Sequence, residues 1–294
     1  MKSLLIPMFC DVDDFCKKLE RYYINHLIPE SGTHKKLILC TSEHLALSEI
    51  MTIVIYFHLS HYRTFKHYYK ELVCNGLREY FPKLVSYNRF VELMKEALVP
   101  LLLYTYKFRL GKTTGISFID STTLDVCHNR RIHSHKVFKG MAERGKSSTG
   151  WFYGFKLHLT VNDKGEILGF CLTPGDTDDR AVDVVDKITK GLYGRLFGDK
   201  GYISKKLFQE LYSKGIFLVT KLKRNMKNKL MLLEDRLLLR KRAIIESVND
   251  FLKNICQIEH SRHRSPTNFL VNLVSGITAY SFLPSKPSLN IIRT

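Results

Sequence analysis

The chain has 294 residues, enough to bury a sizeable core and to form one large domain or two smaller ones. Apolar residues make up 45% and charged residues 25%, as in an ordinary globular protein. The net charge of +18 is unevenly placed, because residues 111–294 carry 31 Lys and Arg against 17 Asp and Glu. Such a surplus favours a polyanionic partner, since each phosphate neutralised releases counterions. A basic protein without a nucleic-acid role is the alternative.

The cysteines and the hydropathy of the sequence indicate the cellular compartment in which the protein is expected. The seven cysteines are odd in number and show no tight pairing, which favours reduced thiols over a disulfide framework. The apolar run at residues 1–7 is too short for a signal peptide, and no stretch approaches the roughly 18 apolar residues of a membrane span. We expect a soluble cytoplasmic protein with no membrane contact.

Residues 1–110 are predicted to be helical. Between residues 45 and 58, apolar side chains recur every three or four positions, which places them on one helix face. Ser86 is placed to cap a further helix that runs toward Pro100. We expect this region to be a helical domain that contacts DNA.

Aromatic and basic residues interleave at residues 62–70, between these helices. Such a stretch can stack on bases and pair with phosphates through side chains such as Arg63 and Lys66. It can equally be an amphipathic helix whose aromatic rings belong to the core. The sequence leaves both interpretations open.

From residue 111 the pattern becomes strand-like. Residues 152–161 alternate between apolar and polar side chains, as expected of a strand whose two sets of side chains point opposite ways. A turn at residues 162–165 leads into another strand, and helical and strand patterns then alternate to residue 220. The expected fold class is α/β: a mixed sheet flanked by helices in residues 111–294, preceded by the all-helical residues 1–110.

Two aspartates follow short apolar runs. Asp120 comes after residues 115–119, and Asp199 comes after residues 195–198. Each carboxylate is therefore expected to close a strand at the edge of the sheet, where side chains from neighbouring strands converge. The acids Asp176, Asp178 and Asp179, which follow Pro174-Gly175, are interpreted instead as turn and helix-start residues.

A third acid, Glu246, falls on a predicted helix from about residue 236 to residue 255. At 100° per residue one face of this helix is apolar, while Arg242, Glu246 and Lys253 share the opposite polar face. That face could rim a site. An ordinary solvated face with an Arg242–Glu246 ion pair is the alternative.

Three carboxylates from two strand ends and one helix suit a site for divalent metal ions. Mg²⁺ prefers oxygen ligands and keeps several waters, so two or three carboxylates and a substrate phosphate suffice. Two ions about 3.5–4 Å apart can activate the attacking oxygen of a phosphodiester reaction and stabilise the leaving oxygen. If Asp120, Asp199 and Glu246 meet in the fold, they could bind a pair of Mg²⁺ ions, for which Mn²⁺ is a substitute.

These residues resemble the signature of DDE transposases from bacterial insertion sequences. The motifs are Asp120-Ser121-Thr122, then Gly198-Asp199-Lys200-Gly201-Tyr202, then Arg242 with Glu246 and Lys253. The three acids are separated by 79 and 47 residues, which is comfortable for that fold. The tyrosine of the family's signature would fall at Leu239, where this chain departs from it. The helical front end is most similar to the insertion sequence 982 group, through Glu49–Thr52, Phe57-His58 and Tyr62-Arg63.

The resemblance implies an RNase H-like catalytic core in residues 111–294. Water would attack a phosphodiester at the end of the insertion sequence (the DNA element that is moved), and the freed 3′-hydroxyl would then attack target DNA. The partners would be double-stranded DNA, as terminal inverted repeats and as target, with a homodimer bringing two ends together in the bacterial cytosol or nucleoid. Arg242 and Lys253 would steady DNA or Glu246 rather than hold metal.

Other basic residues are candidates for contacts to the DNA backbone. Residues 128–147 hold six Lys and Arg against one Glu, and residues 221–229 hold five in nine positions without an acid. The cysteine and histidines at residues 127–135 fit no common zinc-finger spacing, so a basic loop is favoured over a zinc site. Solvated loops are the alternative for both segments. The candidates are Arg130, Arg131, Lys136, Lys221, Lys223 and Arg224.

Two further functions stay open beside strand cleavage and transfer. One is a catalytically inert DNA-binding protein derived from a transposase, and the other is a metal-dependent nuclease that cuts without joining.

His158, on the predicted strand of residues 152–161, is interpreted as a hydrogen-bonded structural histidine rather than a phosphate contact.

Overall fold

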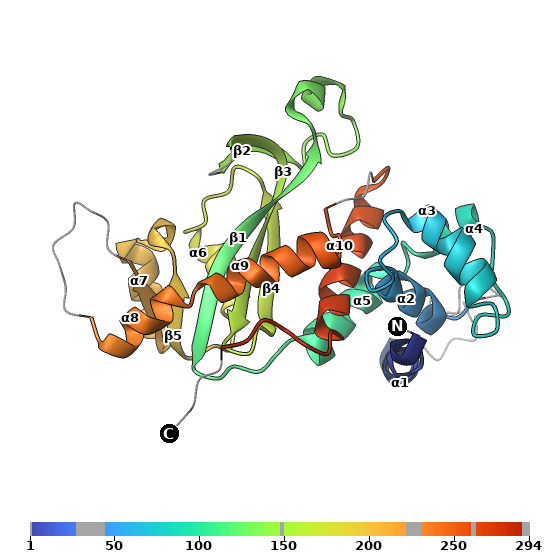
Figure 1. Cartoon of the computed structure of the whole chain (residues 1–294), viewed down its shortest axis with the longest axis horizontal. Coiled ribbons are helices and arrows are strands. Elements are labelled where there is room, and N and C mark those ends of the chain that lie inside the picture. Colours follow the sequence, from blue (N-terminus) through green and yellow to red (C-terminus); the bar gives the residue numbers. More distant parts are fainter. Residues whose placement is uncertain (1, 28–44, 148–149, 222–230, 260–262, 290–294) are drawn as a thin grey trace. The chain divides into compact units, whose positions relative to one another are not determined.

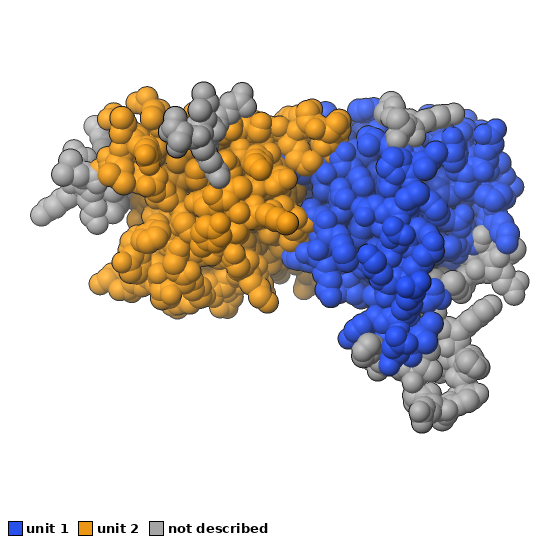
Figure 2. All heavy atoms as spheres, turned by 90° about the horizontal axis from the view of Figure 1, so that it is seen from below, with its two compact units in different colours: residues 1–109, 252–282 blue, residues 110–251, 283–294 orange. Residues whose placement is uncertain are grey.

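The computed structural model describes residues 2–27, 45–147, 150–221, 231–259 and 263–289 (Figure 1). The chain divides into two compact units, coloured separately in Figure 2. The helical unit comprises residues 1–109 and 252–282, and the sheet unit comprises residues 110–251 and 283–294. Within the described ranges, no helix is long and apolar enough to cross a membrane.

The first part of the helical unit follows the sequence pattern closely. Helix α2 (Leu47–Phe57) confirms the helix predicted from the apolar stripe, and α4 (Tyr87–Leu93) begins after Ser86, whose hydroxyl accepts a hydrogen bond from the Arg89 amide at 3.4 Å. The unit's remaining elements are α1 (Lys2–Leu27), α3 (Phe65–His67), the π-helical η1 (Tyr68–Gly76), α5 (Leu98–Tyr104), π-helical η2 (Thr105–Arg109) and α10 (Pro266–Ser281).

Helix α10 completes the core of this unit although it lies far along the chain. It packs against α2, α5 and η2 and is buried over most of its length. The hydroxyls of Thr105 and Thr278 are 2.6 Å apart. The ring of His58 lies between the Cys256 carbonyl and the Ser275 hydroxyl, the latter at 3.0 Å. The sequence patterns described above did not predict this helix.

The aromatic stretch at residues 62–70 contributes to the same core. Tyr68 and Tyr69 are buried, and the Tyr68 hydroxyl donates to the Ile53 carbonyl at 3.0 Å. Arg63 and Lys66 are exposed. The core interpretation therefore holds for these two tyrosines, while the cations face solvent.

The sheet unit contains a six-stranded mixed sheet, which together with its flanking helices confirms the predicted α/β class. Strand β1 (Ile116–Cys127) is central and pairs antiparallel with the long β3 (Gly150–Asn162). On its other side β1 pairs in parallel with β5 (Gly194–Gly198), which pairs in parallel with β6 (Ile216–Thr220). The far edge of β3 is shared by β2 (Glu143–Ser147) and β4 (Ile167–Pro174).

Helices cover the sheet. Residues of α6 (Val182–Ile188) and α7 (Lys205–Ser213) form a buried apolar cluster with Ile119 of β1 and Ile216 of β6. Helix α9 (Ala243–Asp250) contacts β1, and α8 (Leu233–Arg240) contacts β5 and β6 (Figure 1). Because neighbouring residues of a strand face opposite ways, Ile119 and Asp120 lie on opposite faces of the sheet.

Both faces of β3 are buried, and its polar residues are bonded within the protein; the Thr160 hydroxyl, for example, donates to the Ile188 carbonyl at 2.6 Å. Two expectations about this unit are wrong. The predicted basic loop at residues 128–147 contains the 3₁₀ turn η3 (Asn129–Ser134) and the edge strand β2. The single helix predicted for residues 236–255 is broken between α8 and α9 and continues after α9 as the π-helical η5 (Phe251–Ile255).

Candidate active site

Asp120 lies in the middle of β1, not at its end as the apolar run suggested. The parallel pairing of β1 with β5 stops at Phe118 and Phe197, whereas the pairing with β3 continues to Cys127. The edge of β1 that faces β5 therefore becomes free just before Asp120. Because β5 ends there, the Asp120 carboxylate lies at an open edge of the sheet.

Asp199 follows the last residue of β5 and caps the 3₁₀ turn η4 (Lys200–Tyr202). One oxygen of its carboxylate accepts a hydrogen bond from the Gly201 amide at 2.7 Å. The backbone at Gly198 is closely packed, because an added Cβ would lie 3.1 Å from a methyl carbon of Ile119, which would have to shift. Tyr202 is buried in the apolar cluster below and holds the turn against the sheet. The Gly201 amide and the packing of this turn thus fix the position of Asp199.

The turn between α8 and α9 brings Arg242 to Asp120. Its guanidinium lies 3.7 Å from a carboxylate oxygen of Asp120 and donates to Glu246 at 2.7 Å. The amide nitrogen of Asn249 lies 3.5 Å from the other oxygen of Asp120. Arg242, Glu246 and Asn249 are spaced four and three residues apart and so share one helix face. The same spacing could have identified Asn249 in the sequence, where it was overlooked.

The three acids influence one another electrostatically. The pKa of Asp120 is raised to about 6, chiefly because burial penalises its charged form. The Arg242 charge and the Ser121 amide lower this pKa, while the charges of Asp199 and Glu246 raise it further. Burial also raises the pKa of Tyr202, and the charges of Asp120, Asp179 and Asp199 add to that effect. Asp120, Asp199 and Glu246 therefore belong to one electrostatic neighbourhood.

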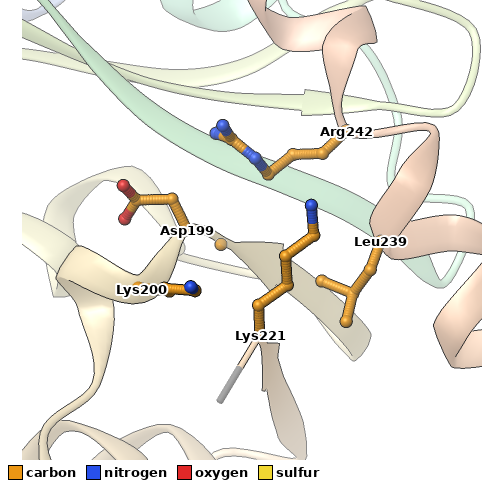
Figure 3. A pocket seen from close by; sticks show the side chains of 6 residues that line it. Asp199, Lys200, Lys221, Leu239 and Arg242 are labelled. Carbon is orange, nitrogen blue, oxygen red and sulfur yellow. The ribbon is translucent and has the colours of Figure 1, made fainter. Parts of the chain in front are cut away.

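A pocket opens beside Asp199 (Figure 3). It is bordered by side chains from the loop after β5, from the residue after β6 and from the turn between α8 and α9. Three of the lining residues are cations against one carboxylate, a balance that suits a phosphate group. The lining residues are Gly198, Asp199, Lys200, Lys221, Leu239 and Arg242.

The donor set fits a divalent cation in its chemistry. Carboxylate oxygens are the ligands that Mg²⁺ prefers, and water can complete its shell. Within the described ranges, however, no three side chains of His, Cys, Asp or Glu are grouped as a metal cluster. The Arg242 guanidinium contacts both Asp120 and Glu246 and supplies the positive charge that compensates them. A cation bound by both acids would have to replace these contacts.

A second polar network lies behind Asp120. The Ser121 hydroxyl donates to Asp179 at 2.8 Å, and the Lys156 ammonium lies 3.3 Å from the same carboxylate oxygen. His158 is hydrogen-bonded to Thr173 at 2.9 Å, and burial lowers its pKa to about 4, so that it is neutral at pH 7. This confirms the structural interpretation of His158.

Asp179 therefore makes contacts beyond the helix-start role that was predicted from the sequence. The turn chemistry predicted for the acids after Pro174-Gly175 holds for Asp178, which accepts from the Arg180 amide at 2.9 Å and pairs with the Arg180 guanidinium at 2.6 Å. Asp179 instead reaches the strand that carries Asp120. The sequence gives no local signal for this contact, because its partners lie 58 and 23 residues away.

The other candidate DNA contacts lie in different parts of the chain. Arg130, Arg131 and Lys136 are exposed in and after η3. Lys253 belongs to the helical unit and pairs with Glu259 at 3.1 Å. It does not continue the face of Arg242 and Glu246 on one regular helix, because η5 intervenes. Lys223 and Arg224 lie outside the described residues.

The sequence was compared with models of known protein families. Residues 110–266 match the model of a family described as a transposase DDE domain. This segment is more than half of the chain and includes β1, β5 and α9 with Asp120, Asp199 and Glu246. No match was found among proteins with curated descriptions.

Proposed function

The chain belongs to the transposase DDE domain family, and from this premise we propose that it catalyses DNA strand cleavage and strand transfer of an insertion sequence. Family membership itself makes it a nucleic-acid-cleaving transferase that binds DNA. The observation that carries the more specific proposal is the convergence of Asp120, Arg242 and Glu246 beside Asp199, from two parallel strands and one helix.

In this proposal Asp120, Asp199 and Glu246 are the catalytic acids. The family generally uses divalent metal ions, and we propose that these carboxylates hold two Mg²⁺, or Mn²⁺ in its place. When bound, such ions supply the charge that activates an attacking hydroxyl and neutralises the leaving oxygen. The hydrogen bond from Gly201 orients Asp199, and Asn249 and the Ser121 amide orient Asp120.

The basic lining of the pocket would hold the DNA backbone. Lys200, Lys221 and Arg242 place three positive charges around Asp199, and charge-assisted hydrogen bonds to phosphate are among the stronger polar contacts. Arg242 would have two partners: the acids before metal binds, and a phosphate afterwards. Arg130, Arg131 and Lys136, together with Lys223, Arg224, Lys253, Arg63 and Lys66, would add further backbone contacts.

The strand order supports an RNase H-like core. Strands β4, β3 and β1 are antiparallel neighbours in the sheet, and β5 and β6 run parallel to β1. Asp120 belongs to β1, and Asp199 directly follows β5, the parallel neighbour of β1. We further propose that residues 1–110 bind the element's ends, that a homodimer pairs two ends, and that the protein is of the insertion sequence 982 type and acts in the bacterial cytosol.

An assay of the full chain on DNA carrying the element's ends tests the proposal. With Mg²⁺ or Mn²⁺ we expect cleavage at the ends and joining of pre-cleaved ends to target DNA. Asp199→Asn should abolish both activities, whereas Asp176→Asn, which alters an exposed acid after β4, should preserve them. Undiminished cleavage by Asp199→Asn would reject the assignment of the acids.

The same assay separates the two alternatives. Cutting of the ends without joining would indicate a nuclease. Binding without either reaction, in protein that retains its fold, would indicate an inert DNA-binding relative. Neither alternative is favoured by a specific contact in the structure.

A further inference from the structure

The only tryptophan of the chain, Trp151, lies on the surface of the sheet unit. It is the second residue of β3, directly opposite Lys146 of the edge strand β2, and 54% of its surface is exposed. Single exposed apolar residues are common on protein surfaces, so exposure alone carries no inference. The surroundings of this ring are what distinguish it.

Two cations lie over the indole ring. The guanidinium carbon of Arg144 is 5.0 Å from a ring centroid of Trp151, and the Lys146 ammonium is 5.7 Å from it. Arg144 and Lys146 are two residues apart on β2 and so point to the same face of the hairpin as Trp151. The one acid of this strand, Glu143, points to the opposite face. An aromatic ring and two charges are thus presented together.

The basic segment beside this ring is folded onto the hairpin. The side chain of Asn129 donates to the Trp151 carbonyl at 2.6 Å, which fixes the start of η3. The ring of His135 stacks on Phe138 at 5.6 Å, and Phe138 in turn contacts Phe155 of β3 at 5.5 Å. Four cations of this segment, Arg130, Arg131, Lys136 and Lys139, are exposed or partly exposed. The backbone that carries these four cations is therefore anchored to the hairpin before any partner binds.

We propose that this hairpin face is a binding surface for single-stranded DNA, on which an unpaired base stacks against Trp151 while the surrounding cations contact the backbone. Surfaces that combine aromatic rings with a basic track bind single strands, because every base has a face on which to stack. Charge on an edge strand also prevents sheets from pairing, which accounts for Arg144 and Lys146 but not for the exposed indole. The charge of the surface also disfavours a second copy as its partner.

The surface lies away from the proposed chemistry. Leu159, which pairs with Asp120, is eight residues from Trp151 along β3, a separation of roughly 26 Å at about 3.3 Å per residue. The base on Trp151 would therefore not be the one whose phosphodiester reacts. The surface would hold a displaced or unpaired strand several nucleotides from the site. This inference rests on the proposed function, because it names a form of the same DNA substrate.

The fluorescence of the full chain tests the inference directly, since all tryptophan emission comes from Trp151. A thymidine oligonucleotide should quench this emission strongly at saturation, and a blunt duplex of equal length should change it little. Trp151→Ala should weaken binding of a labelled thymidine oligonucleotide about tenfold or more by anisotropy. Tyr193→Ala removes an equally exposed ring from the same unit and should leave the affinity unchanged.

Each other outcome overturns the inference. Equal quenching by duplex would show that the surface does not select unpaired bases, and unchanged emission with both ligands would show that the ring is not a contact. Equal weakening by Tyr193→Ala would remove the special role of Trp151. Asp199→Asn separates this inference from the proposed function, because it should abolish cleavage and leave quenching intact. Cleavage without quenching would refute this inference alone.

Discussion

Replacing Asp120 by asparagine should stabilise the metal-free fold at neutral pH. Burial raises the pKa of this carboxyl from 3.8 to about 6, so the charged form present at pH 7 is disfavoured in the folded state. A shift of this size corresponds to about 3 kcal/mol, at 1.36 kcal/mol per unit. The side chain is 22% exposed, so this value is an upper bound. An amide of the same shape carries no charge and avoids the penalty.

The difference in stability between Asp120→Asn and the wild type should depend on pH. Below pH 4 the carboxyl is protonated in both states, and the variant and the wild type should be equally stable. Between pH 4 and 6 the unfolded chain releases the proton first, so the wild type loses stability relative to Asp120→Asn. Above pH 6 the difference should stay constant. Only the difference is informative, because the buried His58, His158 and His263, whose pKa values are lowered to about 4, change the wild-type stability in the opposite direction.

Urea unfolding with a metal chelator present measures this difference. Trp151 belongs to the same unit as Asp120, so its fluorescence reports the unfolding of the sheet unit. Asp176→Asn is the control, because this exposed acid should change the stability by less than about 0.5 kcal/mol. Destabilisation by Asp120→Asn at pH 7, or a difference that does not vary between pH 4 and 6, would refute the reasoning.

Three further changes test other contacts. Arg242→Gln removes the cation that compensates Asp120 and Glu246, and we expect Mn²⁺ to bind several-fold more tightly in a titration followed by electron paramagnetic resonance; weaker binding would contradict this. Asp179→Asn removes the carboxylate beside the largely buried Lys156 ammonium, which keeps its hydrogen bond to the Thr177 carbonyl, and should cost about 2 kcal/mol in urea unfolding, against about 1 kcal/mol for Ser121→Ala. His58→Gln should destabilise the helical unit by about 2 kcal/mol in circular dichroism. In the wild type, the neutral His58 ring adds stability that is lost as the pH falls from 6.5 toward 4. The stability of His58→Gln should therefore fall less over this range. An acid transition equal to that of the wild type would contradict a neutral buried ring.

The elements that could be predicted are those whose signal is local. The apolar stripe of α2, the Ser86 cap and the alternation of β3 depend on residues within a few positions of one another, and each element is present in the structure. The alternation of β3 reports which of its residues are polar and not what covers them. His158 and Thr160 are buried beneath other elements and bonded there.

The candidate site shows the same division. The motifs around Asp120, Asp199 and Glu246 could be recognised in the sequence, and the four-residue spacing alone indicated the pairing of Arg242 with Glu246. The predicted continuous helix wrongly extended that face to Lys253, because no local signal indicated the break before α9 or the π-helical turn after it. Asp179 was missed because its partners are distant along the chain, whereas Asn249 was overlooked although its spacing places it on the helix face of Arg242 and Glu246.

By itself, the sequence determined the α/β class and the strong positive charge, and its motifs supplied the three candidate acids, since composition, periodicity and motif spacing are properties of neighbouring residues. Tertiary structure decided that β5 stops pairing at Phe118, which frees the edge of β1 at Asp120, and that Arg242 compensates two of the acids. It also decided that α10 completes the helical unit and that Trp151 stays on the surface beside two cations. Strand register and packing set these features, and they depend on contacts between residues that are far apart in the chain.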